Sequence, residues 1–504
     1  MTFSADSKAN TVTTAWQKSI LYLVVLLLQL GSGPDSGMAW AQDLESGETA
    51  AEDITTGEQT SETADDQPGP PVYIGRPQLL NEFGEVVPGT RLQGEESHTS
   101  EMRPALTLEE LDEVKQLNAE AIQLQEERIQ EIEQEGGTWA AGLSEELMRL
   151  GQLLRSSGNP EGAVEAYTRA AHISRVNFGL NSAEQVPVLE ELVDTYVELE
   201  QWQEADRQQR HAFYIQTRAY DRTDPRIIPA LESLAMWNVM TFNRGIVVAE
   251  THPLLPLLEA YRLYFAASQL VNVHFGLNDP RYINYLRNMA GTAFRLALYG
   301  SGGEIDRAVS SAGVGFAGTQ ATGRRATRVS GFDEGEEALR QIVDYYEQVA
   351  GDDDEAGMLR LANARLELAD WHLLFNRRQN AFRIYEEVWQ QLSAQDVDLA
   401  HEVFAQIVPL PAFTGDQAPG EELADSGVSS TLSELDQGYV DIQLNINQYG
   451  RPSGVRGVAS KPENHQEAID QVIRSTRDLL FRPQFKDGEE VSREQILVRV
   501  PYWY

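Results

Sequence analysis

Cysteine is absent from the 504 residues, and basic residues are scarce beside acidic ones. The missing cysteine excludes disulfides, thiolate metal sites and a lipid-anchored cysteine, although it leaves the redox compartment undetermined. With 40 Lys and Arg against 78 Asp and Glu, the formal net charge is −38. This balance argues against nucleic acid as a partner, because phosphate binding needs a basic face, and against docking on anionic lipid surfaces.

Catalytic motifs are also missing. The eight histidines are scattered, with no H-E-x-x-H and no pair at helical ligand spacing, and there is no G-x-S-x-G, P-loop or Ser/His/Asp arrangement. Residues 313–318 match G-x-G-x-x-G, but their surroundings are Gly/Ala/Ser-rich, which favours a flexible insertion over a dinucleotide site. The sequence predicts no enzyme, no cofactor and no bound metal.

Only one long apolar run occurs, and it lies near the N-terminus. Lys8 and Lys18 precede the apolar residues 20–30, and residues 39–41 read Ala-Trp-Ala. A charged start, a short apolar core and an A-x-A end are the parts of a cleavable secretory signal, here residues 1–41. A membrane span needs about 17 to 25 apolar residues, and the apolar run at residues 20–30 is shorter than that. We therefore expect a periplasmic mature protein, with an inner-membrane anchor as the alternative.

The next segments differ in composition from the rest of the chain. Residues 42–106 are predicted to be a disordered linker, acidic at first and then Pro-containing, because they cannot bury enough apolar surface to offset the entropy of ordering. Apolar residues at helical intervals then predict an N-terminal helix within 107–142, ending at Gly136-Gly137.

Two phrases recur along the chain without any residue suited to catalysis or metal binding. Residues 177–181 read NFGLN and residues 274–278 read HFGLN, while DPR occurs at 224–226 and 279–281. A repeated phrase that lacks chemistry is typical of the loops between structural repeats.

Apolar positions confirm a period in the sequence. Leu150, Leu192 and Leu234 are 42 residues apart, and the two FGLN phrases are separated by 97 residues, as are Leu192 and Met289. The phrase therefore precedes each new helix pair at a fixed distance, and the partner of the helix that contains Met289 is expected only at 334–349.

Small residues recur where two helices would approach each other most closely, as at Gly151, Ala163 and Ala170, and the last unit reads LADWHLLFNRRQNAFRIYEEVW. These residues resemble the tetratricopeptide repeat family, in the longer-period form of kinesin light chains. The resemblance covers 143–392 and implies an α-α solenoid. We place the repeat domain at 143–408, with a flexible insertion at 300–331.

A solenoid of this kind offers a concave groove, lined by first-helix residues that packing leaves free. Consensus offsets place a candidate partner groove at Met148, Gln152, Arg155, Glu190, Asp194, Glu232, Met236, Arg287, Arg295, Asn363 and Asp370. Ordinary solvent-exposed helix surface is the alternative for each of them.

After a linker at 409–436 the hydrophobic period becomes two. Val440, Ile442, Leu444 and Ile446 alternate with polar residues, which predicts a half-buried strand. A returning strand, an amphipathic helix and a final strand follow within 437–504, so the expected order is β-β-α-β. The predicted fold class is mainly α, with a solenoid followed by this small α+β domain.

The tail resembles the C-terminal domain of the periplasmic energy-transducing protein TonB, through GYVDIQLNINQYGRPSGV, the helix that follows and FRPQFKDGEEV. The resemblance implies the fold and suggests an outer-membrane TonB-dependent transporter as a partner. Two departures from TonB are the expected lack of an uncleaved membrane helix and the lack of a long Pro-rich spacer. A Tyr-Pro pair before the first strand is also missing.

The final strand is the candidate edge of this sheet, at Ile496, Val498, Val500 and Tyr502. An open edge accepts an extended peptide as an added strand. The alternative is that the edge is covered by the chain itself, for instance by residues 432–437, or by a second copy.

Three functions are compatible with the sequence. The first is a periplasmic, non-catalytic protein-interaction scaffold that contacts a protein or peptide partner. The second is a membrane-anchored energy transducer of the TonB type. The third is an enzyme whose site only the folded groove would reveal. The repeats and the missing motifs favour the scaffold, and they leave the oligomeric state open.

Overall fold

The computed structural model describes residues 73–74, 77–80, 108–247, 252–300, 331–349, 355–411, 437–463 and 465–503. The expected secretory signal therefore lies outside the described residues. The same holds for most of the two expected linkers and for the interior of the insertion at 300–331.

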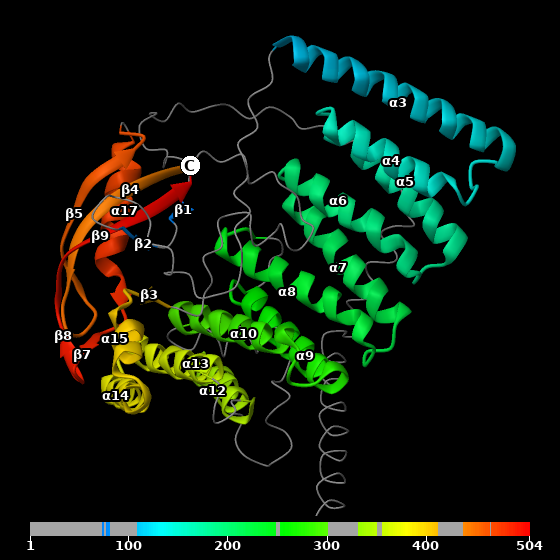
Figure 1. Ribbon diagram of the computed structural model, residues 1–504. Helices are drawn as coiled ribbons and strands as arrows, with labels where there is room; N and C mark the ends of the chain where they lie inside the picture. The colour runs from blue at the N-terminus through cyan, green and yellow to red at the C-terminus, as the bar shows by residue number, and fades with distance from the viewer. Residues whose placement is uncertain are drawn as a thin grey trace, which may run out of the picture.

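Most of the described chain is helical, and its helices pack in consecutive pairs. After α3 (Leu108–Gly136), the first helices of the pairs are α4 (Leu143–Ser156), α6 (Val186–Glu198), α8 (Ile228–Asn243), α10 (Pro280–Tyr299) and α13 (Glu355–Leu374). Their partners are α5 (Pro160–Phe178), α7 (Trp202–Ala219), α9 (Leu255–Phe275), α12 (Phe332–Val349) and α14 (Arg378–Gln395). Figure 1 shows the pairs side by side in chain order along an arc. The predicted mainly-α solenoid is confirmed.

Small residues lie where the helices of a pair touch, as the repeat pattern requires. Ala163 and Ala170 of α5 are fully buried, together with Tyr167 between them. A Cβ built on Gly151 of α4 would overlap the ring of Tyr167. The glycine is therefore needed for the close approach of α4 and α5, because a tightly packed interface has no room for another methyl group.

The repeated FGLN phrase ends the second helix of a pair. α5 ends at Phe178 and α9 ends at Phe275, and the glycine that follows has a positive φ in both copies, 103° at Gly179 and 83° at Gly276. Glycine has no Cβ to clash in this conformation, so it suits the position directly after a helix. The phrase is a helix stop between repeats, as predicted.

The DPR phrase begins the next first helix. Asp224 and Asp279 each accept a hydrogen bond from the backbone N–H two residues later, and Arg226 and Arg281 each grip that same aspartate through two guanidinium nitrogens. Hydrogen bonds from Arg226, first from its side chain and then from its backbone, lower the pKa of Asp224 to about 2. This capped turn supplies partners for backbone groups at the start of a helix.

Each of these arginines also covers an aromatic ring at the end of the preceding helix. The guanidinium carbon of Arg226 lies 4.2 Å from the ring centroid of Tyr220, and that of Arg281 lies 4.4 Å from the centroid of Phe275. A cation over a ring face is attracted by the ring's negative quadrupole. The DPR phrase thus ties the end of one repeat to the start of the next.

The fourth pair is interrupted in sequence but continuous in space. α10 packs on α12, although residues 301–330 separate them. The prediction that the partner of the helix around Met289 is delayed is confirmed. Leu286 and Met289 of α10 lie in the same hydrophobic core as Leu339 and Ile342 of α12.

The tail is a small sheet with one helix packed on it. β4 (Gln437–Ile446), β5 (Pro452–Lys461), α17 (Gln466–Asp478) and β9 (Arg493–Trp503) follow the predicted β-β-α-β order, with the short strands β6 (Leu480–Phe481), β7 (Gln484–Lys486) and β8 (Glu489–Val491) inserted before β9. β4 lies between β5 and β9 in antiparallel pairing. Its alternating apolar residues form the core of the tail with Val472 of α17.

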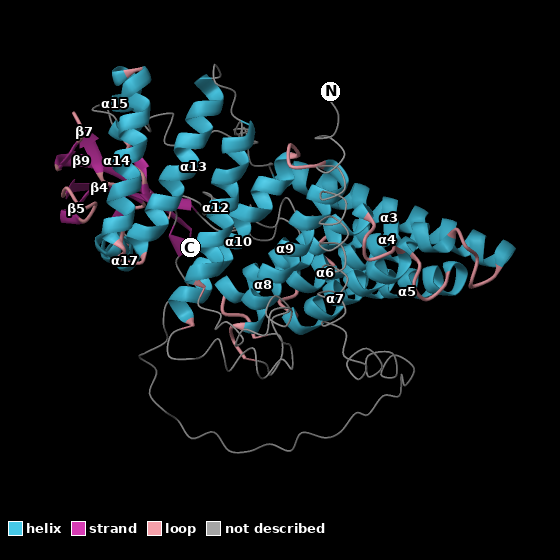
Figure 2. Ribbon diagram, turned by 90° about the horizontal axis from the view of Figure 1, so that it is seen from below, coloured by secondary structure: helices cyan, strands magenta, loops and turns pink. Residues whose placement is uncertain are grey.

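Three short strands outside the tail pair with strands of the tail. β1 (Tyr73–Ile74) and β2 (Gln78–Leu79), from the N-terminal part of the chain, pair antiparallel with β9. β3 (Pro409–Leu410), which follows α15 (Val397–Ala405) at the end of the array, pairs with β6. Figure 2 shows the strands gathered at one end of the molecule and α3 to α5 at the opposite end.

Replacing Gly151 with Ala tests the assignment of the first repeat. The added Cβ meets the Tyr167 ring, so we expect a loss of about 1 to 3 kcal/mol, as for other overpacked cores. Gly142→Ala is the matched control, since a Cβ there has nothing within 4 Å. Thermal unfolding of both variants measures the difference, and equal stabilities would contradict the assigned register.

Candidate partner-binding surface

Some of the predicted groove residues of the first two helix pairs form ion pairs with each other or with neighbouring acids. Arg155 of α4 reaches across to α6, where its Nε lies 2.8 Å from Glu198 and its Nη1 lies 3.3 Å from Glu191 and 3.7 Å from Asp194. Asp194 is itself buried. The prediction that packing leaves Arg155 and Asp194 free is therefore wrong, because these charges link successive first helices.

The remaining residues of this part of the groove are more accessible. Gln152 is exposed and donates a hydrogen bond of 2.7 Å to Glu191, while Met148 is half-buried against the core of the first pairs. Glu190 is exposed, yet its pKa is raised, first by burial and then by the charge of Glu191. The carboxylate of Glu190 thus has many protein atoms around it, although part of its side chain is in contact with solvent.

The next groove residues are also engaged within the array. Glu232 of α8 accepts a hydrogen bond of 2.8 Å from the hydroxyl of Tyr285 on α10. Arg295 donates to Asn243 Oδ1 at 3.0 Å and to the carbonyl of Gly291 at 3.2 Å. Met236 is half-buried against the larger core.

Towards the end of the array the groove residues become more buried. Arg287 of α10 pairs with Glu367 of α13, with 3.2 Å between Nη2 and Oε1, and Glu367 is only 1% exposed. Asn363 is half-buried on the same helix. Of the eleven predicted residues, seven are exposed or half-buried and have no ion pair within the structure described: Met148, Gln152, Glu190, Glu232, Met236, Arg295 and Asn363.

A tyrosine that binds an acid recurs along the array. Besides Tyr285, the hydroxyl of Tyr167 donates to Glu191 at 3.2 Å and that of Tyr385 donates to Asp370 at 2.6 Å. Burial and the neighbouring carboxylate raise the pKa of each of the three phenols, so all of them remain donors at neutral pH. The sequence pattern gave no signal for this pairing.

Asp370 is the groove prediction that the structure corrects most. It is fully buried in α13, and the guanidinium of Arg482 from the tail grips it, with Nε–Oδ1 at 3.0 Å and Nη2–Oδ2 at 2.5 Å. Arg482 is 4% exposed, and the charge of Asp370 raises the pKa of Arg482 although burial acts to lower it. Asp370 does not face a partner, because it joins the array to the tail.

Apolar and main-chain contacts surround this ion pair. The ring of Phe485 lies between those of Tyr385 and Phe404, with centroids 6.0 and 5.2 Å away. Gln484 Nε2 donates to the carbonyl oxygen of Ala405 at 3.1 Å, and the backbone N–H of Arg482 donates to the carbonyl oxygen of Val408 at 2.8 Å. The array and the tail therefore share one buried interface. Sequence analysis missed it, although a lone arginine among apolar residues at 479–485 was the available signal.

The predicted edge strand is not an open edge. Ile496, Val498, Val500 and Tyr502 point into the core of the tail, and β9 pairs with β4 on one side and with β1 and β2 on the other. The alternative that the chain covers its own edge is the one observed, and the covering residues described are Tyr73, Ile74, Gln78 and Leu79. Residues 432–436, the covering segment named as an example above, lie outside the described residues. Sequence reasoning could not find this pairing, because about 420 residues separate the partners.

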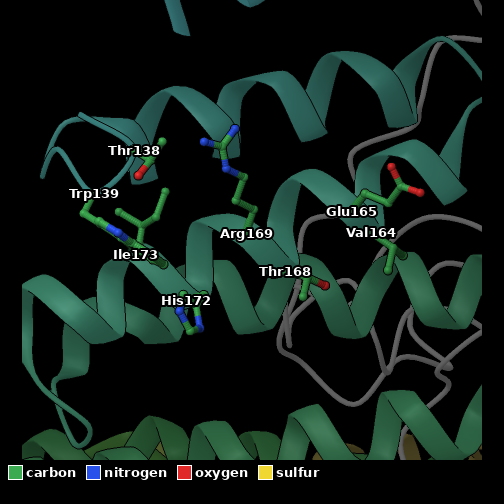
Figure 3. A pocket seen from close by; sticks show the side chains of 8 residues that line it. All are labelled: Thr138, Trp139, Val164, Glu165, Thr168, Arg169, His172 and Ile173. Carbon is green, nitrogen blue, oxygen red and sulfur yellow. The ribbon is translucent and has the colours of Figure 1, made fainter. Parts of the chain in front are cut away.

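A shallow cleft lies between α3 and α5 at the far end of the array. It encloses about 620 Å³ and is lined along α5 from Val164 to Ile173 and by Thr138 and Trp139 (Figure 3). The Trp139 and His172 rings are 5.1 Å apart, and Arg169 forms an ion pair with Glu133 of α3. Arg169, which lines the cleft, thus links α3 to the first pair.

No group of His, Asp or Glu within the described ranges is arranged to hold a metal ion. Among the helices described, none is both long and apolar enough to span a membrane.

Comparison with known proteins gives matches only among solved structures. No protein-family model matches the chain, and no curated protein matches it. Nearly identical TPR-like repeats of Podosopora anserina, named for a kinesin light chain, are 17% identical over 50% of this chain and 95% of theirs, with a TM-score of 0.30. BtubC (BKLC) from P. vanneervenii is 10% identical over 56% of this chain and 92% of its own, also with a TM-score of 0.30. These scores are too low to support a common fold, so the helix-pair array is assigned from its own packing.

Arg482→Met tests the junction between the array and the tail. The variant leaves the carboxylate of Asp370 buried without its cation, so we expect a loss of about 3 to 5 kcal/mol in the free energy of unfolding. Asp370→Asn combined with Arg482→Met removes both charges and keeps an acceptor for Tyr385, so this double variant should recover much of the loss.

The matched control is Arg499→Met, which breaks the more exposed pair with Asp441 in the tail and should cost about 1 kcal/mol or less. Chemical denaturation of the four proteins measures these differences. A double variant that is less stable than Arg482→Met alone would show that the charge pair is not what holds the junction.

Proposed function

We propose that the chain is a periplasmic, non-catalytic protein-interaction scaffold, in which a helical-repeat array and a TonB-like tail are held at a fixed position relative to each other. The observation that carries the proposal is the buried Arg482–Asp370 pair, which makes array and tail one continuous body. Two binding surfaces on one body suit a protein that positions its partners.

The contacts within the array support a rigid rather than an adaptable surface. Arg155, Arg210 and Arg287 each bind acids on a neighbouring first or second helix, and these pairs fix the spacing between successive repeats. Repeat arrays use such extended, preformed surfaces to bind proteins and peptides. Several acidic residues of the array form these ion pairs, which is a structural use of their charge.

A periplasmic location rests on the N-terminal sequence, and contact with outer-membrane transporters or other envelope proteins rests on the resemblance of the tail to TonB. The alternative is an anchored energy transducer. The two differ in the fate of residues 1–41, so the mature N-terminus distinguishes them.

Intact mass spectrometry provides this distinction. Produced in a Gram-negative host, the chain should be released by osmotic shock and should begin at Gln42. Ala39→Gln with Ala41→Gln is the control, because it removes the small residues required for cleavage and should leave the signal attached. A full-length chain recovered in the inner-membrane fraction would instead support the transducer.

Binding on the accessible groove residues can be tested in cells by photo-crosslinking. A photoreactive residue at Met148 or Met236 should give discrete adducts with a second protein. The same residue at Glu387, an exposed position on second helix α14, should not. Identical adduct patterns from all three positions, or no adducts from any of them, would exclude the first-helix face as the partner surface.

A further inference from the structure

The outer edge of β9 is occupied by a short piece of the chain that precedes the array. Tyr73 and Ile74 pair with Trp503 and Tyr502, Gln78 and Leu79 pair with Arg499 and Val498, and the N–H of Leu80 donates to the carbonyl of Leu497 at 2.9 Å. We call residues 73–74 and 77–80 the strap.

The described pairing of the strap with β9 is shorter than that of β4 with β9. β4 is in register with β9 from Gln437 to Ile446, whereas the strap consists of two ladders of two residues each. Val500 and Pro501 lie between these ladders; they pair with Val440 and Tyr439 of β4 on one side, and no strap residue is described as their partner on the other. Pro77, which has no N–H to donate, lies at the start of the second ladder.

The side chains of the strap nevertheless fit the tail closely. Pro77 and Leu80 are buried, and Leu79 packs against the core formed by β4, β9 and α17. The position on β9 therefore has two properties of a peptide-acceptor edge, namely main-chain groups that form a ladder with an added strand and an apolar site for one end of that strand.

The other edge of the sheet is poorly suited to strand addition. β5 begins at Pro452, ends at Lys461 and carries register shifts opposite Asp441/Ile442 and Gln443/Asn445. Prolines, lysines and bulges are the features that protect natural edge strands from further pairing. Of the two edges described, the strap-covered edge of β9 is the one that offers an apolar site to an added strand.

The geometry points to the strap as an intramolecular occupant of an acceptor edge. When the strap is released, an extended peptide with an apolar pair at the positions of Leu79 and Leu80 takes its place on β9. This inference rests on the proposed scaffold function and names its partner class at the tail. A tethered segment competes at a high effective concentration, of order mM for a short flexible link. The intact chain should consequently bind such a peptide weakly, because only the strap-released fraction is competent.

The test uses the strap's own sequence as the probe. A labelled nonapeptide of residues 72–80 (VYIGRPQLL) is titrated with the mature chain, and binding is followed by fluorescence anisotropy. Leu80→Pro in the protein removes the donor to Leu497 and should open the edge, so this variant should bind the peptide at least about 10-fold more tightly than the intact chain. The same substitution in the peptide should abolish binding.

The second variant fixes the strap on β9 with a disulfide that can be reduced, and it does not require the strap to be released by a mutation. The natural chain has no cysteine, so Gln78→Cys with Arg499→Cys, at a paired position, introduces the only possible disulfide. The oxidised form should bind no peptide, and reduction should restore the weak binding of the intact chain. Arg499→Cys alone controls for the lost pair with Asp441.

Peptide binding that is equal in the intact, opened and locked proteins would overturn the inference, because the peptide would then bind elsewhere. Lack of binding to a folded Leu80→Pro chain at about 1 mM peptide would overturn it as well, since this concentration matches the effective concentration of the tether. Neither result depends on the mature N-terminus or on the crosslinks at Met148 and Met236, so failure of the strap is distinguishable from failure of the scaffold.

Discussion

The ion pair between Arg482 and Asp370 is the contact on which the relation between array and tail depends. A charge pair that is almost fully removed from water is tolerated only if its hydrogen-bonding capacity is satisfied. Here Asp370 accepts from Arg482 through both oxygens and from Tyr385. The cost of separating the pair is correspondingly high, because either partner alone would be a buried charge.

Several other acidic residues of the array are also bound by arginine or tyrosine side chains. Arg155 bridges the first and second pairs, Arg287 bridges α10 and α13, and tyrosine hydroxyls bind acids between helices at three places. Each of these contacts joins neighbouring elements of a solenoid, in which a repeat touches little beyond its neighbours. The stiffness of the surface thus follows from contacts that repeat along it.

The tail sheet is built from both ends of the chain. β4, β5 and β9 come from the C-terminal residues, while β1 and β2 come from the segment before the array. β3, at the end of the array, adds a further pairing with β6. Strands from before and after the array therefore meet in one small domain. The strap on β9 is followed in the chain by the first helices of the array.

The sequence by itself determined the helix pairs of the array, the long strands and the helix of the tail, and their order. Helical spacing of apolar residues, small residues such as Ala163, glycines after FGLN and the period-two pattern from Val440 to Ile446 are local signals, and local signals are sufficient for helices, strands and their stops. Only the tertiary structure decided which polar residues remain accessible and which edge of the sheet is covered. Asp370 meets Arg482 across 112 residues, and Leu79 meets Val498 across the whole array. Contacts at such separations have no period along the chain, and they form only when packing brings the distant segments together.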